Sequence, residues 1–322
     1  MKYSLLAVDH SDFGDSHWER FHALLVSLRA RGLGNPPPST RRALQARVMG
    51  RIRVGDRFRE WVIFEGERPV GWVALTPRGR TPDGRGIIVF HFNFEPGLAV
   101  ASFAPLLASR LSDTMQAEAC EVAHALSPEA HLDGLRQAWG GTILSSMVRY
   151  RLDREHANRA LIEQWLVEYP EQFPELRLDV FDELPERYID GWISTFQQFT
   201  EDMPNEGGPS LPFAMTREEV ERLQEFRRNN RQFLYTAVLF DPSGQIIGHS
   251  NMQTPSYPPV EWHQAMTGIA REWRGRGLSK WLKAALFVQT GLDFPESRYI
   301  VTEMRSVNEP ILAVNRAMGY EK

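Results

Sequence analysis

Residues 266–282 carry the strongest chemical signal in the sequence. A mainly apolar stretch, residues 266–270, leads into REWRGRGLSK, in which two glycines lie among basic residues. This pattern predicts a strand, a glycine-rich turn and a helix that begins near Leu278. Backbone N–H groups converge in such a turn, and the N-terminus of the helix adds positive potential. We therefore expect the turn to bind a pyrophosphate group.

The glycines and the basic residues of this turn have different roles. Gly275 and Gly277 tolerate positive φ and let a phosphate approach the backbone closely. Arg274, Arg276 and Lys280 add mobile positive charge around the same point. Together they predict a site for a doubly charged anion.

Two other phosphate-binding patterns do not fit this sequence. A Rossmann loop follows the first strand of a parallel unit and has an acidic residue about 20 positions further on. The pattern G-x-x-x-x-G-K-[ST] of a P-loop is absent. Residues 78–86 have a similar basic and glycine-rich composition, but a predicted strand follows them instead of a helix. We interpret residues 78–86 as a solvated hairpin loop.

The turn resembles the acyl-CoA pyrophosphate loop of the GNAT acyltransferase superfamily. That loop has the pattern Q/R-x-x-G-x-G/A, and Arg274 to Ser279 match it with a serine at the final small position. Residues 301–320 resemble the second CoA-binding motif, a strand and an asparagine-led helix followed by glycine and an aromatic residue. Asn308 and Asn315, with residues 200–204, make the chain similar to bacterial tandem GNAT proteins of the mycothiol synthase type.

The resemblance implies direct transfer of an acetyl group from acetyl-CoA to an amine through a tetrahedral intermediate, with no metal. It also implies that the strand before the turn pairs with the pantetheine arm. A backbone N–H near Thr267 or Gly268 would polarise the thioester carbonyl, and removing such donors elsewhere costs roughly 3 kcal/mol. The cofactor-binding residues implied are Thr267, Gly268, Ile269, Arg274, Gly275, Arg276, Gly277, Leu278, Ser279, Lys280 and Asn308.

A general base must remove a proton from an alkylammonium group whose pKa is about 10. His263 lies four residues before Thr267, so regular strand alternation places both side chains on one face, and imidazole titrates in a suitable range. Glu303, at the end of the next predicted strand, is the second candidate base. Glu261 and Asp202 are candidate contacts to the acceptor.

The general acid is less well defined by the sequence. GNAT proteins often have a tyrosine four residues before the glycine of the glycine–aromatic pair, and Asn315 occupies that position here. Asparagine supplies no proton to a thiolate, although it can form a hydrogen bond with sulfur. A water, Tyr257 or Tyr320 remains as the proton donor, or the thiolate leaves unaided because its pKa is modest.

The elements around these motifs occur twice in the same order. Gly71 lies 69 residues before Gly140, and Gly248 lies 71 residues before Gly319. In both halves the later glycine directly follows a predicted helix, which favours two copies of one unit. A connecting helix is predicted at 155–168. The elements predicted for the second half are strands at 176–181, 232–248 (with a turn), 263–270 and 299–303, and helices at 185–199, 278–290 and 309–318.

The predicted fold class is α/β, with an α+β mixed sheet in each of two tandem GNAT-like domains. We predict a first domain at residues 1–153, a helix and linker at 154–174, and a catalytic domain at 175–322. The first domain is expected to be degenerate, because Glu95 and Pro96 stand where its phosphate loop should be. Proline lacks an N–H donor, and a carboxylate repels an anion.

The two copies differ at their last strand. The first copy continues through a predicted strand at residues 142–152, whereas the second stops at Lys322. A sheet without its closing strand exposes an edge. Either the strand lies beyond the given sequence or another segment of the chain fills its place.

The composition limits the class of protein. The 322 residues favour two domains, and 42% hydrophobic with 24% charged residues is typical of a globular protein. A net charge of −4 argues against nucleic-acid or membrane partners, and a single cysteine, Cys120, excludes an internal disulfide and a thiolate cluster. The start of the chain has no secretory signal pattern, so we expect a cytoplasmic protein. We also expect it to be a monomer or a homodimer.

The leading functional prediction is an acetyl-CoA-dependent N-acetyltransferase that acts on the amine of a small metabolite. One alternative is a protein or peptide N-acetyltransferase. A second alternative, from a different class, is a CoA-binding module without turnover, which Asn315 favours.

Overall fold

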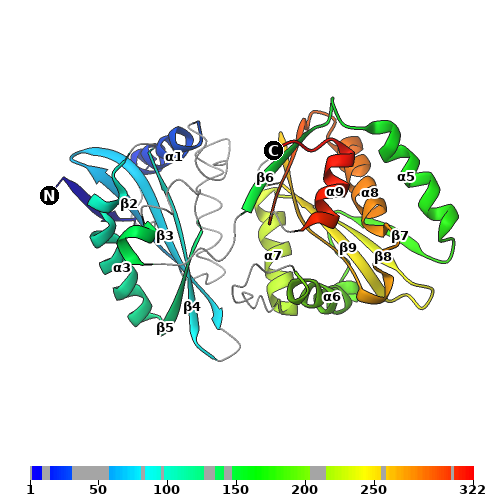
Figure 1. The fold of residues 1–322 in the computed structure, drawn as a ribbon, viewed down its shortest axis with the longest axis horizontal. Helices are drawn as coiled ribbons and strands as arrows, with labels where there is room; N and C mark the ends of the chain where they lie inside the picture. The colour runs from blue at the N-terminus through cyan, green and yellow to red at the C-terminus, as the bar shows by residue number, and fades with distance from the viewer. Residues whose placement is uncertain are drawn as a thin grey trace. The chain divides into compact units, whose positions relative to one another are not determined.

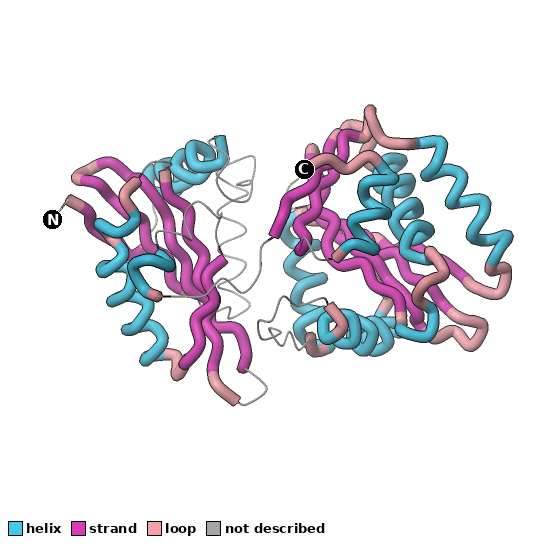
Figure 2. Tube along the Cα trace, viewed as in Figure 1, coloured by secondary structure: helices cyan, strands magenta, loops and turns pink. Residues whose placement is uncertain are grey.

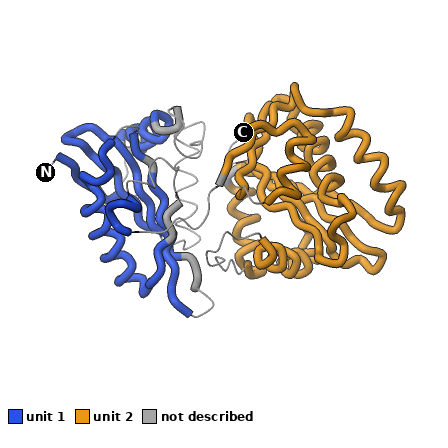
Figure 3. The backbone as a smooth tube through the Cα atoms, viewed as in Figure 1, with its two compact units in different colours: residues 1–144, 211–213 blue, residues 145–210, 214–322 orange. Residues whose placement is uncertain are grey.

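The computed structural model of the chain describes residues 2–8, 15–30, 58–80, 84–95, 98–126, 135–140, 147–203, 215–254, 259–305 and 308–322 (Figure 1). These residues form β-sheets with helices packed on both faces (Figure 2). The described residues up to Gly140 form one compact unit, and those from Met147 onward form a second (Figure 3).

The first unit contains a five-stranded sheet in the order β1-β2-β3-β4-β5. Its elements are β1 (Tyr3–Ala7), α1 (Asp15–Ala30), β2 (Arg59–Glu65), β3 (Arg68–Arg80), β4 (Gly86–Phe94), α3 (Ala104–Ala117) and β5 (Cys120–Leu126). Strands β4 and β5 are parallel, and the other neighbours are antiparallel. Alternation along β2 places Trp61 and Ile63 in the core with α3, and Val62 in the core with α1.

The second unit contains a six-stranded sheet in the order β6-β11-β10-β9-β8-β7. Strands β10 and β11 are parallel, joined by the crossover helix α8, and their other neighbours are antiparallel. The strands are β6 (Met147–Asp153), β7 (Arg177–Phe181), β8 (Leu234–Phe240), β9 (Ile246–Gln253), β10 (Glu261–Ile269) and β11 (Tyr299–Arg305). The helices are α5 (Arg159–Gln172), α6 (Ile189–Glu201), α7 (Arg217–Asn230), α8 (Leu278–Asp293) and α9 (Glu309–Met318).

Helices cover both faces of this second sheet (Figure 1). Helices α5, α8 and α9 pack on the side we call the α8 face, where Tyr235 and Leu239 of β8 point. Helices α6 and α7 pack on the other side, the α6 face, where Val238 and Phe240 point. Because strand side chains alternate, each catalytic candidate can be assigned to one face.

Strand β6 closes the second sheet, and the sequence-based assignment of this strand to the first domain is wrong. All seven residues of β6 pair with β11, from Asp153–Tyr299 to Met147–Arg305. Leu152 is fully buried in the core of the α8 face. Strand β6 covers the edge of β11, so the second unit begins ahead of the predicted boundary at residue 153. The earlier part of the predicted strand, residues 142–146, lies outside the described residues.

Helix α5 extends into the segment that the sequence predicts as a linker, residues 169–174. Its buried residues Ile162, Trp165 and Tyr169 follow a helical spacing. Tyr169 stacks against Trp281 of α8 with ring centroids 6.4 Å apart. This packing keeps the last turn helical through Gln172 even though Pro170 lies inside it.

Helix α7 is missing from the sequence-based prediction. Thr216 caps its N-terminus, and the Glu219 side chain accepts from the backbone N–H of Thr216, so a complete capping box is present. The helix is rich in charged residues, so its apolar periodicity is weak. The Thr-x-x-Glu spacing was the available signal for it.

The position of β6 leads to a test of the domain boundary. A fragment of residues 145–322 should fold, whereas a fragment of residues 154–322 should not, because it loses β6 and leaves the edge of β11 and the Leu152 pocket open. Circular dichroism and thermal melting of the two fragments measure the difference. Equal cooperative melting of both would show that β6 is dispensable.

Candidate active site

The parallel ladder between β10 and β11 is short. It contains three residue pairs, from Glu261–Tyr299 to His263–Val301. Beyond them, β10 pairs only with β9 and β11 only with β6, within the gap-free described range 259–305. The facing edges of the two strands therefore keep unpaired backbone groups, which can pair with an extended ligand.

A β-bulge between Gln264 and Thr267 causes this divergence. The extra residue also reverses the side-chain alternation of β10. The Gln264 Nε2 donates to Ser250 Oγ at 3.1 Å, and Ser250 Oγ lies 2.7 Å from Thr267 Oγ1, so these side chains share the α8 face. His263 precedes the bulge and points to the α6 face. The prediction that His263 and Thr267 share a face is therefore wrong, because it assumed regular alternation.

The glycine turn follows β10 directly and leads into α8. Gly275 and Gly277 have φ values of 76° and 77°, in the left-handed region that glycine occupies readily. Gly277 is the N-cap of α8. The backbone N–H groups of residues 275–279 have no acceptor among the described residues. Free N–H groups at a helix N-terminus form a site suited to a phosphate.

Arg274 is fixed in place by two acceptors. Its Nε donates to the carbonyl oxygen of Ile269 at 2.8 Å, and its Nη2 donates to the Asp202 carboxylate. Arg271 binds the same carboxylate and, as the main cause, holds the pKa of Asp202 below its usual range. The sequence predicts Asp202 as an acceptor contact, but in the structure it ties the end of α6 to the turn.

Two cations beside the turn lie over aromatic rings. The Arg276 guanidinium lies 4.6 Å from the centroid of the Trp273 ring, and the Lys280 ammonium lies 5.6 Å from that of Trp165. Within the described part of the chain, neither has a carboxylate partner. Their positive charge therefore remains available to an anion at the turn.

Tyr169 of α5 is a neighbour of the turn that the sequence does not reveal. A Cβ placed on Gly277 would collide with the Tyr169 hydroxyl oxygen. Burial raises the pKa of Tyr169, so its hydroxyl stays protonated at neutral pH and can donate beside the turn. Gly277 is thus required both for its φ and for this close approach.

Gly268 plays a packing role in β10. The Phe199 ring of α6 occupies the space where a Cβ of Gly268 would stand. Its paired residue on β9, His249, is fully buried and contacts the same ring. Ile269, the next residue, is buried in the core of the α8 face. Glycine at 268 therefore lets α6 pack directly against the diverging strand.

Both candidate bases lie on the α6 face, as their register requires. His263 pairs with Val301, and Glu303 lies two residues further along β11. Arg149 of β6 bridges this group, with its Nη2 3.0 Å from Glu261 Oε1 and its Nη1 3.8 Å from Glu303 Oε1. The structure thus brings both predicted bases and Glu261 together, and adds Arg149.

The environment keeps the His263 imidazole neutral at pH 7. Burial is the main cause that lowers its pKa, Arg149 acts in the same direction, and Glu303 and Glu261 oppose them. Its Nδ1 is buried and has no partner among the described residues. A neutral imidazole with an unpaired nitrogen can accept a proton.

Asn315 lies on the opposite face of the sheet from His263 and Glu303. It is fully buried, and its Nδ2 donates to the Met304 Sδ at 3.6 Å. Its Oδ1 has no partner within the described chain. Asn308 is the N-cap of α9, where its carbonyl oxygen accepts from the Leu312 N–H at 3.1 Å.

A buried polar group on the α8 face was not anticipated from the sequence. The hydroxyl of Tyr320 donates to Gln264 Oε1 at 2.9 Å, and burial raises the pKa of this tyrosine. The Lys283 ammonium lies 5.6 Å from the Tyr320 ring centroid, and burial lowers its pKa to about 7. These contacts connect the β10 bulge to α8 and to the segment after α9. Tyr257, the other predicted proton donor, lies outside the described residues.

Among the described residues, the first unit shows no equivalent glycine turn before its crossover helix. Helix α3 begins at Ala104 without a glycine N-cap, and Phe103 takes that position. Phe94 and Phe103 are fully buried in edge-to-face contact with centroids 4.8 Å apart, so aromatic rings fill the core there. The Glu95 carboxylate lies 2.6 Å from an Arg68 nitrogen. Pro96 lies outside the described residues, and the degeneracy of this unit stays a prediction.

Two kinds of feature are absent from the described residues. No helix there is both long enough and apolar enough to cross a membrane. No group of three or more histidine, cysteine, aspartate or glutamate side chains there is arranged to hold a metal ion.

The described residues form two mixed α/β units, and a solved tandem GNAT protein superimposes on nearly the whole chain. The chain has this fold, and the predicted fold class is confirmed. No protein-family model and no curated protein sequence matches the chain.

Solved structures with this fold align with nearly the whole chain. A tandem GNAT protein from the clavulanic acid biosynthesis pathway matches with a TM-score of 0.71 and 17% identity, over 99% of this chain and 95% of that chain. A GCN5-related N-acetyltransferase from Sphaerobacter thermophilus matches with a TM-score of 0.60 and 12% identity, over 99% and 92%. A glucosamine N-acetyltransferase region of a fungal multi-domain β-N-acetylglucosaminidase matches with a TM-score of 0.59 and 12% identity, over 99% and 37%.

The contact between Gly277 and Tyr169 leads to a double-mutant test. Gly277→Ala should destabilise the protein, because alanine at φ 77° costs about 1–2 kcal/mol and its Cβ meets the Tyr169 hydroxyl. The same substitution in a Tyr169→Phe background should cost less, since the colliding oxygen is gone. Thermal unfolding of the four proteins measures the coupling. Strictly additive changes would show that the two residues do not touch.

Proposed function

We propose that the second unit is an acyltransferase that binds acetyl-CoA and directs its acetyl group to the amine of a small molecule. One observation carries this proposal. The unpaired edge of β10 leads straight into a turn whose backbone N–H groups, at residues 275–279, are free. An extended arm that ends in a diphosphate fits this arrangement, in which a strand edge with unpaired backbone groups is followed by a turn of N–H donors.

In this proposal the turn binds the diphosphate. The N–H groups of residues 275–279 donate to it, and Arg276 and Lys280 add charge that no described carboxylate neutralises. Arg274 is held by Ile269 and Asp202, so it contributes positive potential from a fixed position. Acetyl-CoA supplies the activated acyl group, and the chain's own residues orient it.

The edge of β10 orients the acyl end. The side chain of Thr267 is engaged with Ser250, so this residue contributes through its backbone. A backbone N–H near Thr267 or Gly268 would polarise the thioester carbonyl, as the resemblance implies. The bulge places these groups beside the diverging strands instead of in the ladder.

His263 is the proposed base, with Glu303 and Glu261 as its charged neighbours. The two carboxylates and the single Arg149 leave a net negative charge, which attracts an ammonium group to the α6 face. The buried, neutral imidazole can then accept the proton that makes the amine nucleophilic. Glu303 is the alternative base in the same cluster.

Asn315, the third proposed catalytic residue, lies on the other face of the sheet from His263 and Glu303. Its amide is engaged with Met304 on the α8 face, so a role at the leaving sulfur would require that contact to open. A thiolate needs no strong acid to leave, because thiol pKa values are modest.

A small-molecule acceptor is favoured over a protein acceptor. Two proteins of the same fold come from small-molecule chemistry, one from clavulanic acid biosynthesis and one a glucosamine N-acetyltransferase region. Acidic residues around His263 suit a compact ammonium group. A cytoplasmic location and a monomeric or homodimeric state complete the proposal.

Binding and turnover can be tested separately. Calorimetry should detect acetyl-CoA binding, and Arg276→Glu should weaken it at least about tenfold because a charge-assisted contact is replaced by repulsion. Arg222→Glu, an equal charge change on α7, is the control and should leave the affinity unchanged. Absence of binding to the unaltered protein would refute the proposal. Thiol release over a panel of amines then measures turnover, and tight binding without release on any amine would favour a module without catalysis.

The pH dependence of kcat/KM identifies the base. Because burial lowers the pKa of His263 in the folded protein, the midpoint of the acid-side decline in activity should lie below the ordinary histidine value of about 6.5. Glu303→Gln should move this decline to lower pH, and Arg149→Gln should move it to higher pH, since these charges act on the imidazole in opposite directions. His263→Ala should lower kcat at least about a hundredfold. A decline that stays in place in all three variants would remove His263 from the role.

A further inference from the structure

A cavity of about 400 Å³ lies apart from the candidate active site. It is bordered by the last turn of α7, by residues 182–184 after β7, and by the start of β8. Strand β9 separates β8 from β10, so the cavity lies toward the β7–β8 edge of the sheet, away from the diverging strands β10 and β11. Its volume is in the range of small-molecule sites.

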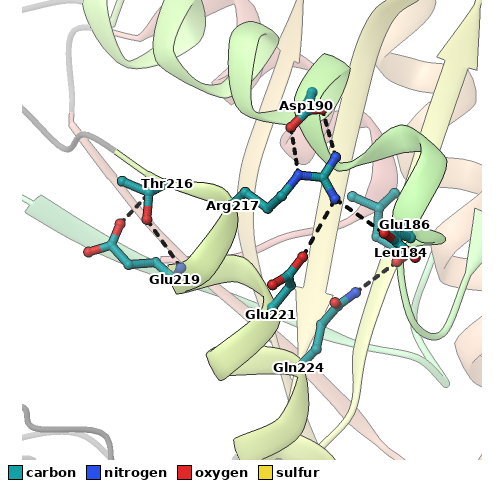
Figure 4. A network of polar contacts seen from close by, with 8 residues as sticks. All are labelled: Leu184, Glu186, Asp190, Thr216, Arg217, Glu219, Glu221 and Gln224. Carbon is teal, nitrogen blue, oxygen red and sulfur yellow. Dashed lines mark hydrogen bonds and ion pairs between the residues drawn. The ribbon is translucent and has the colours of Figure 1, made fainter.

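The walls of this cavity are held by contacts within the second unit. The Gln224 Nε2 donates to the carbonyl oxygen of Leu184 at 2.8 Å, and both residues line the cavity (Figure 4). At the start of α7, Arg217 binds Asp190 of α6 through two nitrogens (Figure 4). These bonds fix α7 relative to α6 and to the segment after β7, so the cavity does not depend on a mobile helix.

Three arginines from the end of α7 line the cavity, together with two carboxylates. Arg228 forms an ion pair with Glu183, which neutralises both. Arg227 and Arg231 then face a single remaining carboxylate, Asp182. The cavity therefore has a net charge of +1 from its own side chains.

Arg227 is the residue that makes this charge significant. It is partly buried, and within the described part of the chain its guanidinium has neither an ion-pair partner nor a hydrogen-bond acceptor. Burial lowers its pKa to about 10, so it remains charged at neutral pH.

Arg154 provides an internal comparison. Burial lowers its pKa to about 10 as well. Arg154, however, donates to the Phe287 carbonyl oxygen at 2.7 Å and to Thr290 Oγ1 at 2.6 Å, and it lies over the Phe287 ring. The fold thus supplies acceptors to the buried Arg154 guanidinium, whereas the partly buried Arg227 guanidinium lines a cavity.

We propose that this cavity is a binding site for a small molecule carrying one anionic group, a carboxylate or a phosphate, which the Arg227 guanidinium holds. The planar guanidinium matches both anions with two parallel hydrogen bonds. The anion offsets the net positive charge of the cavity and supplies the missing acceptors. The same charge disfavours a cation. The site is independent of the proposed acyl transfer, since it shares no residue with the glycine turn or the His263 cluster.

The test follows the Arg227 side chain directly. Arginine Nε–Hε resonances of the full chain are recorded by NMR, and those of Arg227 and Arg222 are assigned by their loss in Arg227→Gln and Arg222→Gln. Inorganic phosphate and acetate are titrated separately, with sodium chloride holding the ionic strength constant. We expect a saturable shift of the Arg227 resonance with at least one anion and none for Arg222, which is on the same helix outside the cavity.

A second measurement gives the size of the effect. In thermal-unfolding titrations with the same anion, Arg227→Gln should require about tenfold more ligand for the same stabilisation, and Arg222→Gln should behave like the unaltered protein. The larger response to phosphate or to acetate identifies the anionic group. The proposal is wrong if the Arg227 resonance does not shift, or if it shifts without saturation and in parallel with Arg222. Neither result depends on acetyl-CoA binding, so the proposed function is judged separately.

Discussion

The bulge in β10 between Gln264 and Thr267 has more consequences than any other local feature of the second unit. A single extra residue ends the ladder with β11 after three pairs and reverses the side-chain alternation. It also directs the chain toward the turn at Gly275 and Gly277. Backbone groups that a regular parallel sheet would pair internally are left for a ligand. Phe199, packed where a Cβ of Gly268 would stand, stabilises this irregular path from the α6 face.

The sheet separates two kinds of polar environment. On the α6 face, Arg149, Glu261, Glu303 and His263 form a charged group around a neutral imidazole. Beside the bulge on the α8 face, Tyr320 instead donates to Gln264, and the Lys283 ammonium lies over the Tyr320 ring. This difference favours acceptor chemistry on the α6 face. The first unit has the same kind of sheet, but buried phenylalanines fill its core and its crossover helix lacks a glycine N-cap.

The failures of sequence-based prediction each have a physical cause. Strand β6 could not be assigned to its sheet, because adjacent sequence favours the first unit and only the ladder with β11 shows the pairing. The predicted face of Thr267 was wrong, because regular alternation was assumed from His263 to Thr267 and one extra residue in a strand has no clear local signature. Helix α7 was missed because its charged surface obscures the apolar period, although the capping box at Thr216 was visible. Tyr169 was assigned to a linker although it contacts the glycine turn.

The sequence by itself determined the α/β class, the two tandem units and the position of the glycine turn before α8. These depend on local signals, namely periodicity, glycine spacing and the order of elements, which a chain expresses without long-range contacts. Only the tertiary structure decided which strand closes the second sheet, which face each catalytic candidate occupies, and which guanidinium lacks an acceptor. Those properties depend on residues far apart in the chain, as when Arg149 reaches Glu261 or when burial leaves Arg227 facing a cavity. Strand pairing and desolvation are set by the packed fold, and no local pattern encodes them.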